Sequence, residues 1–334
     1  MTHYYLGVDV GSSRTRALIA DERGRVCGFG EAGAGNHESV GYDGLSAALH
    51  IATGQALSQS GLSIDHMTGA GFGVSGFDWP SEREPMLREI GKLGLNAPIA
   101  LVNDALIGLV AGAPEGWGVA LVAGTGCNCW GRDRHHNIGR MTGMGWTAGE
   151  AAGATELVEE AVRRIARAWT QRSPATRLTE AFLKSTGAVS AQDFLEGLSQ
   201  DRYAVNASVA PVVFGVAAEG DVVAREVIDW AGRELGSLAI GVIRQLGFES
   251  MPFDVIMVGS LFDGGSRLID PMQSAIRQVA PRARFVRLSV PPVVGGVLLA
   301  VEQTRQDPAA IRLALIQSVS QFVERLPNTA WAAK

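Results

Sequence analysis

Two glycine-rich turns in this sequence could each hold a phosphate group. They occupy residues 7–15 and 122–128, and Asn103 and the acidic Asp104 fall between them. Glycine lets the backbone approach an anion closely, and neighbouring amide and hydroxyl groups can donate to its oxygens. The candidate phosphate contacts are Gly11, Ser12, Ser13 and Thr15 in the first turn and Gly124, Thr125 and Gly126 in the second. Either turn alone is equally typical of an ordinary hairpin, but together they suggest a nucleotide held from two sides.

Asp9 lies near the end of the first apolar run, inside the first glycine-rich segment and just before Gly11. One carboxylate in such a place can hold a Mg²⁺ ion that keeps most of its water ligands. The turn is not a Walker A loop, because no Gly-Lys-Ser/Thr sequence follows it.

The elements around these residues repeat. Short β-rich runs at 4–10, 16–20 and 26–30 predict an antiparallel meander, and a second meander starts at Trp117. The sequence at 99–111 predicts a strand, an acidic residue and a helix, the order in which an open α/β sheet presents a side chain at its edge. Two duplicated halves that face each other would place both turns in one cleft.

The second half also contains segments with helical or buried-strand patterns. The predicted helices are 155–169, 191–198, 205–219, 221–246, 293–301 and 307–326, and the predicted strands are 254–258 and 284–288. We expect the last helix to pack back on the first lobe.

Length and composition narrow the classes of function. A chain of 334 residues favours two domains. The formal net charge is −5 and the basic residues are scattered, so we expect no nucleic-acid partner. No apolar run approaches the roughly 20 residues that span a bilayer, and no signal peptide is recognised. Three cysteines, Cys27, Cys127 and Cys129, fit a reducing compartment, so we expect a cytoplasmic protein without a membrane partner.

The motifs resemble, in order, those of the actin, hexokinase and heat-shock ATPase superfamily. Within it the chain is most similar to the BadF/BadG/BcrA/BcrD family, in its N-acetylglucosamine kinase branch. The matching segments are 9–15, 36–37, 73–78, 104, 124–128, 145–146 with 149–150, 259–260 and 295–296. The resemblance implies an α/β, ribonuclease H-like duplicated fold with two lobes and a central cleft. We place the first lobe at 1–113 plus 305–334 and the second at 114–304.

The resemblance also implies roles for residues on the ATP side. Asp104 would be the catalytic base that takes the proton from the 6-hydroxyl of an amino sugar. The alternative is an aspartate that only caps the following helix. Asp9 would hold Mg²⁺, so that the implied cofactors are ATP and Mg²⁺. The implied adenosine side consists of Gly259, Ser260, Gly295 and Gly296.

On the sugar side the resemblance implies a second set of residues. These are Asn36, His37, Asp78, Asn128, Trp146, Gly149 and Glu150. Amide side chains can discriminate sugar hydroxyls, and tryptophan offers a flat face to a sugar ring. Trp146 is as typical of a core, and Asn36 of an ordinary loop. Relatives continue Gly-Asp-Glu-Gly-Ser where this chain has Gly149, Glu150 and Ala151, so N-acetylglucosamine and glucosamine both remain open as substrates.

Two other functions remain open for the sequence. One is an ATPase that activates a 2-hydroxyacyl-CoA dehydratase or benzoyl-CoA reductase, which needs two cysteines per subunit around a shared iron–sulfur cluster. Cys127 and Cys129 have neither the spacing nor the position for that cluster. The other is a non-catalytic sugar sensor that keeps the pocket. The resemblance further implies a homodimer.

Overall fold

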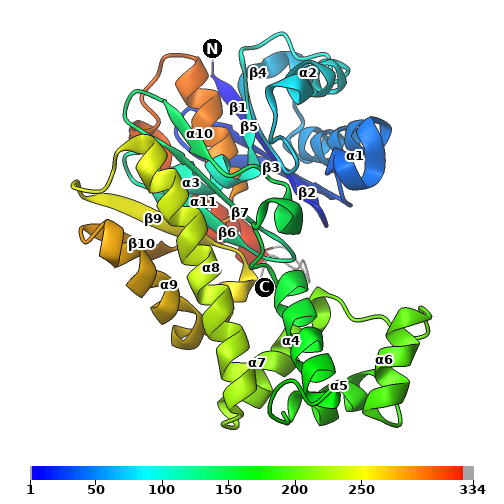
Figure 1. The fold of residues 1–334 in the computed structure, drawn as a ribbon. Coiled ribbons are helices and arrows are strands. Elements are labelled where there is room, and N and C mark those ends of the chain that lie inside the picture. The colour runs from blue at the N-terminus through cyan, green and yellow to red at the C-terminus, as the bar shows by residue number, and fades with distance from the viewer. Residues whose placement is uncertain (1, 326–334) are drawn as a thin grey trace.

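The computed structural model describes residues 2–325, and its first half is built on a five-stranded mixed sheet (Figure 1). Three antiparallel strands form the predicted meander, and two further strands extend it in parallel beside β1. The strand order is β3-β2-β1-β4-β5. The strands are β1 (Tyr4–Val10), β2 (Thr15–Asp21), β3 (Val26–Ala32), β4 (Met67–Val74) and β5 (Ile99–Asn103).

The second half repeats this sheet strand for strand. Its order is β10-β9-β6-β7-β8, again with an antiparallel meander on one side of the first strand and two parallel strands on the other. The strands are β6 (Gly118–Ala123), β7 (Cys127–Arg132), β8 (Ile138–Arg140), β9 (Phe253–Val258) and β10 (Ala283–Arg287). The predicted α/β duplication is therefore confirmed.

Helix α1 (His37–Ser60) packs on β2 and β3, and α2 (Arg83–Gly91) packs beside α1. The contact with β3 is close because that strand carries glycines. A Cβ atom at Gly28 would lie 2.1 Å from the carbonyl oxygen of Ala56, and one at Gly30 would lie 2.0 Å from that of Ala52. The first turn of α1 is set apart from the rest by a break at Gly41, whose φ of 69° suits glycine.

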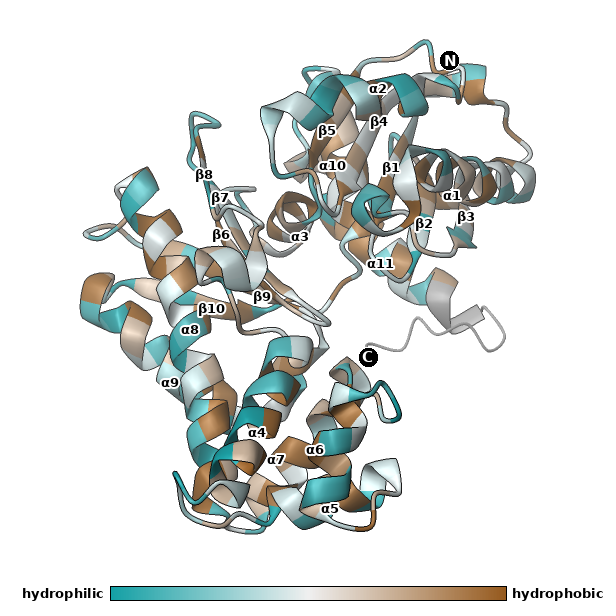
Figure 2. Ribbon diagram, turned by 45° about the vertical axis from the view of Figure 1, so that its right-hand side comes forward, coloured by the Kyte–Doolittle hydropathy of each residue, from teal (hydrophilic) through white to brown (hydrophobic). Residues whose placement is uncertain are grey.

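Two helices cross between the halves. Helix α3 (Asp104–Gly112) follows β5 but also packs on β6 and β7, and α10 (Val293–Gln303) follows β10 but packs on β1 and β4. Figure 2 shows α3 lying between the two sheets. Helix α10 thus packs on the first sheet, and the lobe boundaries at 113/114 and 304/305 stay a prediction.

The packing of α10 also explains why glycine occupies positions 295 and 296. Both glycines are buried in α10, and their place on the adenosine side stays a prediction. A Cβ atom at Gly295 would lie 1.9 Å from the carbonyl oxygen of Ile107, and one at Gly296 would lie 3.0 Å from the Cα of Gly7. These glycines allow α10 to approach α3 and β1 closely, which is a structural role.

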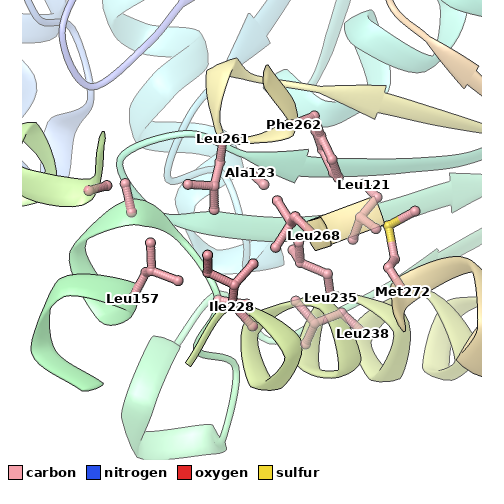
Figure 3. Close-up of a cluster of buried hydrophobic side chains, with 14 of the residues drawn as sticks. Leu121, Ala123, Leu157, Ile228, Leu235, Leu238, Leu261, Phe262, Leu268 and Met272 are labelled. Carbon is pink, nitrogen blue, oxygen red and sulfur yellow. The ribbon is translucent and has the colours of Figure 1, made fainter. Parts of the chain in front are cut away.

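A helical insert between β8 and β9 enlarges the second lobe. It contains α4 (Ala154–Trp169), α5 (Leu178–Thr186), α6 (Ala191–Ser199), α7 (Ala210–Ala218) and α8 (Val222–Leu246). Asp221 caps α8 by accepting from the amide of Ala224, and left-handed Gly247 ends it. Helix α9 (Ser266–Val279), which the sequence did not predict, packs along α8. Figure 3 shows the core shared by these helices and the sheet, with Leu157 at one end of the cluster, Met272 at the other and Leu235 between them.

Helix α11 (Ala309–Arg325) packs against β3 and α10, as expected for a return to the first lobe. The hydroxyl of Ser318 accepts from the amide of Val26 at 2.9 Å. The sequence predicts that this helix ends at residue 326, which lies outside the described residues. Within residues 2–325, no helix is both long and apolar enough to cross a bilayer.

Candidate active site

A cavity of about 560 Å³ lies between the lobes, and both glycine turns line it. Its wall also carries Asp104 and Asp78 from the first lobe and Asn128 from the second. The predicted residues that line it are Gly11, Ser12, Ser13, Asp78, Asp104, Gly124, Thr125, Gly126 and Asn128. Residues far apart in the sequence thus meet in one place.

The first turn joins β1 to β2 as a tight hairpin, with the amide of Gly11 donating to the carbonyl of Arg14 at 2.8 Å. Thr15 does not reach the cavity. It is fully buried in β2 beneath Gly35, whose Cβ would lie 2.6 Å from the Thr15 hydroxyl oxygen. Its neighbours Arg14 and Arg16 do line the cavity, and the sequence analysis missed them.

The second turn joins β6 to β7 and rests on the start of α4. The amide of Gly124 donates to the carbonyl of Gly126 at 2.9 Å, and the amides of Ala154 and Thr155 donate back to the turn. Gly259 follows β9 beside it, with a φ of 106°. A Cβ atom at Gly259 would lie 2.3 Å from the carbonyl oxygen of Ala123, so only glycine fits this approach.

Asp104 is the most perturbed carboxyl group at the cavity wall. Burial, followed by the negative charges of Asp9 and Asp78, raises its pKa to about 7. Asp9 lies at the end of β1 and is set back from the cavity wall. Burial raises the pKa of Asp9 to about 6, and the charge of Arg16, its cross-strand neighbour, opposes that rise. Strongly perturbed acids in a cleft mark a candidate active site.

Asn103, not Asp104, caps helix α3. The amide of Ala105 donates to Asn103 Oδ1 at 2.9 Å, and Asp104 is the first helical residue. The alternative of a capping aspartate is therefore wrong in this structure. Because the cap is supplied by the preceding residue, the Asp104 carboxylate is left at the cavity wall.

Asp78 is almost fully buried, at 6% exposure, and accepts hydrogen bonds from both lobes. Its Oδ1 accepts from Asn103 Nδ2 at 3.2 Å and from Asn128 Nδ2 at 3.1 Å. Burial raises its pKa to about 6.

Asn36 and His37 lie behind the cavity wall rather than in it. Asn36 caps α1 through its Oδ1, and its Nδ2 donates to Ser12 Oγ at 3.2 Å. The His37 ring stacks on Tyr42, and its Nε2 lies 3.8 Å from a carboxylate oxygen of Glu82. Glu38 lines the cavity instead, a position that the capping role of Asn36 could have indicated.

Glu150 uses both carboxylate oxygens to hold a loop. Oε1 accepts from the amide of Thr142 at 2.7 Å, and Oε2 accepts from that of Gly143 at 2.8 Å. Gly143 lines the cavity beside Asp78, whereas Glu150 does not. Left-handed Gly149 ends the short 3₁₀ helix Gly145–Ala148 and also stays outside the cavity.

Trp146 faces the helical insert. Its Nε1 donates to Glu159 Oε2 at 2.7 Å, its ring stacks on Trp230 with centroids 5.9 Å apart, and the Arg163 guanidinium lies 4.0 Å above it. The cavity lining does not include it. The structure therefore does not bring Trp146 together with Asp104.

A second cavity of about 420 Å³ lies where α4 and α7 meet the 3₁₀ helix Ser260–Gly264. Phe214, Pro211 and Leu261 supply an apolar lining, and Ser208, Ser260 and Asp263 supply polar groups. Apolar walls with a few polar groups suit a planar heterocycle. Ser260 lines this cavity and Gly259 precedes it, while their contact with adenosine stays a prediction.

The cysteines near the second turn have structural contacts. Cys127 Sγ donates to the carbonyl of Glu150 and accepts from the amide of Ala152. Burial raises its pKa to about 12, and Cys129 is fully buried. In the described part of the chain, no three His, Cys, Asp or Glu residues are grouped so that they could hold a metal ion.

Comparison with known proteins identifies relatives over most of the chain. A model of the BadF/BadG/BcrA/BcrD ATPase family matches residues 6–300. The N-acetylmuramic acid/N-acetylglucosamine kinase of Clostridium acetobutylicum is 23% identical over 302 residues, which cover 89% of this chain and 98% of the relative. The N-acetyl-D-glucosamine kinase of Dictyostelium discoideum is 23% identical over 314 residues, covering 90% and 98%.

Solved structures agree on the fold. A protein of Chromobacterium violaceum, provisionally assigned as an N-acetylglucosamine kinase, matches with a TM-score of 0.65 at 22% identity, covering 89% of this chain and 99% of that one. The predicted two-lobed actin/hexokinase-like fold is confirmed.

Proposed function

The chain belongs to the BadF/BadG/BcrA/BcrD ATPase family, and we propose that it transfers the γ-phosphoryl group of ATP to the 6-hydroxyl of an amino sugar. The observation that carries this proposal is the position of Asp104 in one cavity with both glycine turns. Its relatives named as N-acetylglucosamine kinases support an N-acetylglucosamine acceptor, and glucosamine is the alternative.

Asp104 acts as the general base. Its carboxylate accepts the proton of the attacking sugar hydroxyl as the bond to the γ-phosphorus forms, a contribution of roughly 10² to 10⁴ in rate. A pKa near 7 keeps this group poised close to neutral pH, where it is a stronger base than an ordinary aspartate.

The glycine turns hold the phosphate groups. Backbone amides and the hydroxyls of Ser12, Ser13 and Thr125 face the cavity from opposite lobes, so both can donate to phosphate oxygens. Arg14 and Arg16 also line the cavity, and although both guanidinium groups pair with Glu31, they add positive charge that favours phosphate binding. The apolar pocket around Phe214 receives the adenine ring.

The residues present fit a Mg²⁺ ion carried in with ATP. Burial raises the pKa of Asp9, and the charge of Asp9 contributes to the raised pKa of Asp104, so a nearby divalent cation would offset both effects. Asp9, set back from the wall, suits contact through water. When bound, the ion neutralises charge on the transferred phosphoryl group.

The sugar end of the cavity is acidic and contains side-chain hydrogen-bonding groups. Glu38, Asp78 and Asn128 line it together with Gly143. Because Glu150 positions the backbone of Gly143, its replacement of the family's aspartate acts on the shape of the sugar site rather than by direct contact. This indirect role leaves the choice between an N-acetylated and a free amino group to experiment.

The dehydratase-activator alternative finds no support in the cysteines. Cys129 is fully buried in β7, and Cys127 is engaged with the loop that contains Glu150 and Ala152. A shared iron–sulfur cluster needs accessible thiolates at a subunit interface. We also infer a homodimer, on the resemblance that implied it at the outset, and a cytoplasmic location, on the cysteine content of the sequence.

ADP release measured across hexoses, N-acetylhexosamines and free hexosamines tests the function. We expect sugar-dependent release with N-acetylglucosamine or glucosamine and a much lower rate with plain hexoses. The Asp104→Asn variant is the control for background hydrolysis. A folded, ATP-binding protein that releases no ADP with any hexosamine would refute the kinase and favour the sugar sensor.

A further inference from the structure

The loop after β4 belongs to the first lobe and contacts the second lobe through two side chains. Within it, Asp78 Oδ1 accepts from Asn128 Nδ2 of the second lobe at 3.1 Å. The next residue, Trp79, lies under the guanidinium of Arg140 in β8, with 4.6 Å between the Arg140 Cζ and the ring centroid. A Cβ atom at Gly143 would lie 2.4 Å from the Asp78 carboxylate, so the second lobe meets this loop closely.

Asn103 links this contact between the lobes to Asp104. Its side chain is 1% exposed, and both of its polar atoms are used. Oδ1 accepts from the amide of Ala105 and caps α3, the helix that begins with Asp104. Nδ2 donates to Asp78 Oδ1 and to the carbonyl of Phe77, both at 3.2 Å.

Only an amide side chain can do both jobs at this position. A carboxylate or a hydroxyl can cap the helix, but a carboxylate has no proton to donate, and a hydroxyl has a single one on a shorter side chain. Asn103 therefore supplies a direct chain of hydrogen bonds from Asn128, through Asp78, to the first turn of α3.

We propose that Asn103 is a positioning residue that couples contact between the lobes, made at Asp78, to the orientation of Asp104. The inference rests on the proposed kinase function and adds a role for Asn103 that the sequence analysis did not assign. When Asn128 engages Asp78, Asn103 is held from both sides and fixes the start of α3. When the lobes part, Asp78 loses one of its two amide partners and Asn103 loses that support.

Replacing Asn103 with serine separates the two jobs. Asn103→Ser keeps a hydroxyl cap but loses the bonds to Asp78 and Phe77. We expect kcat to fall about 10- to 100-fold, because a displacement of about 1 Å at a catalytic group can lower the rate by about that factor. KM for ATP should change little. Asn96→Ser, in an exposed loop of the same lobe, is the matched control and should keep the wild-type kcat.

A swap of the two side chains provides a rescue test. Asn103→Asp keeps the cap and the size of the side chain but places like charges together, so kcat should fall. In the Asn103→Asp/Asp78→Asn double variant, the new amide can donate to position 103 and still accept from Asn128. We expect the double variant to recover at least tenfold over Asn103→Asp. A double variant no faster than the slower single variant would overturn the proposal.

A double-mutant cycle tests the contribution of the second lobe to this coupling. Asn128→Ser removes the donor on that side, and the Asn103→Ser/Asn128→Ser variant should lose no more kcat than the larger single loss. Fully additive losses would overturn the coupling. The two hypotheses fail differently, since the kinase proposal fails if the wild type releases no ADP, and this one fails if an active wild type shares its kcat with Asn103→Ser.

Discussion

The two sheets have the same strand order but present different chemistry at the same edge. In the first sheet, Asp9 lies near the end of β1 and Asp104 directly follows β5. Asp78 lies in the loop after β4. In the second sheet the corresponding positions after β6 and β9 are Gly124 and Gly259, with Ser260 beside the latter.

This difference indicates a division of work within a duplicated frame. The first sheet gathers carboxylates whose pKa values are raised, which suits proton transfer and metal contact. The second supplies close backbone approaches and an apolar pocket, which suit the nucleotide. Substitutions on the two sheets should therefore damage different kinetic parameters.

The largest expected effect comes from the first sheet. Asp104→Asn removes the base without changing side-chain size, so kcat should fall by roughly 10² to 10⁴ while KM for ATP stays near the wild-type value. Asp254→Asn in β9, which pairs with Arg284, is the matched control and should retain kcat. A loss of less than tenfold for Asp104→Asn would mean that another group accepts the proton.

The second sheet should respond through ATP binding. Gly259→Ala forces a side chain into a backbone with a φ of 106° and against the Ala123 carbonyl oxygen, so the 3₁₀ helix Ser260–Gly264 must shift. We expect KM for ATP to rise on the order of tenfold and the protein to lose about 1 to 3 kcal/mol of stability.

Gly247→Ala is the control for backbone strain, since Gly247 is also left-handed but a Cβ atom there would meet nothing within 4 Å. It should lose about 1 kcal/mol without any change in KM. If Gly259→Ala raised the sugar KM and left that for ATP unchanged, the division between the sheets would be wrong.

A smaller effect is expected on stability, with a defined pH dependence. The Asp104 pKa is raised from 3.8 to about 7 on folding, so the native state binds this proton more tightly than the unfolded state. The ionised group therefore destabilises the fold above pH 7, and that cost fades as the pH falls toward 4. Asp104→Asn removes the cost.

Thermal melting should thus show Asp104→Asn to be more stable than the wild type at pH 8, by several degrees, at about 1.4 kcal/mol per unit of pKa shift. The gain should shrink steadily as the pH is lowered to 5. Asp254→Asn should show no such gain. An advantage that grows toward acid pH would contradict the raised pKa.

Local sequence signals predicted the duplicated meanders and both turns because those depend on strand alternation and glycine placement. They do not indicate which tertiary contacts a residue makes. Gly295 and Gly296 have the same local signal whether a ligand or another helix approaches them, and here α3 and β1 do. Helix α9 was missed because Pro271 interrupts its pattern, as proline removes a backbone donor.

The sequence contains a pattern that could have indicated two overlooked cavity residues, Arg14 and Arg16. Side chains alternate along a strand, so a buried Thr15 implies that Arg14 and Arg16 share the opposite, cavity-facing side. The bifunctional role of Asn103 had no such signal, because the sequence does not show that Asp78 lies within hydrogen-bonding distance of it.

The smallest expected effect concerns Trp146, which tests whether the sugar site extends into the helical insert. Trp146 is 42% exposed, and its side chain contacts Trp230, Glu159 and Arg163 rather than the cavity. Trp146→Ala should therefore change the sugar KM by less than about threefold while it lowers the melting temperature slightly, since stacking and cation–π contacts contribute about 1 kcal/mol each. Trp169→Ala, exposed at the end of α4, is the matched control. A tenfold rise in the sugar KM for Trp146→Ala alone would mean that the 3₁₀ helix Gly145–Ala148 turns toward the cavity when sugar binds, and the second lobe would then take part in acceptor recognition beyond Asn128.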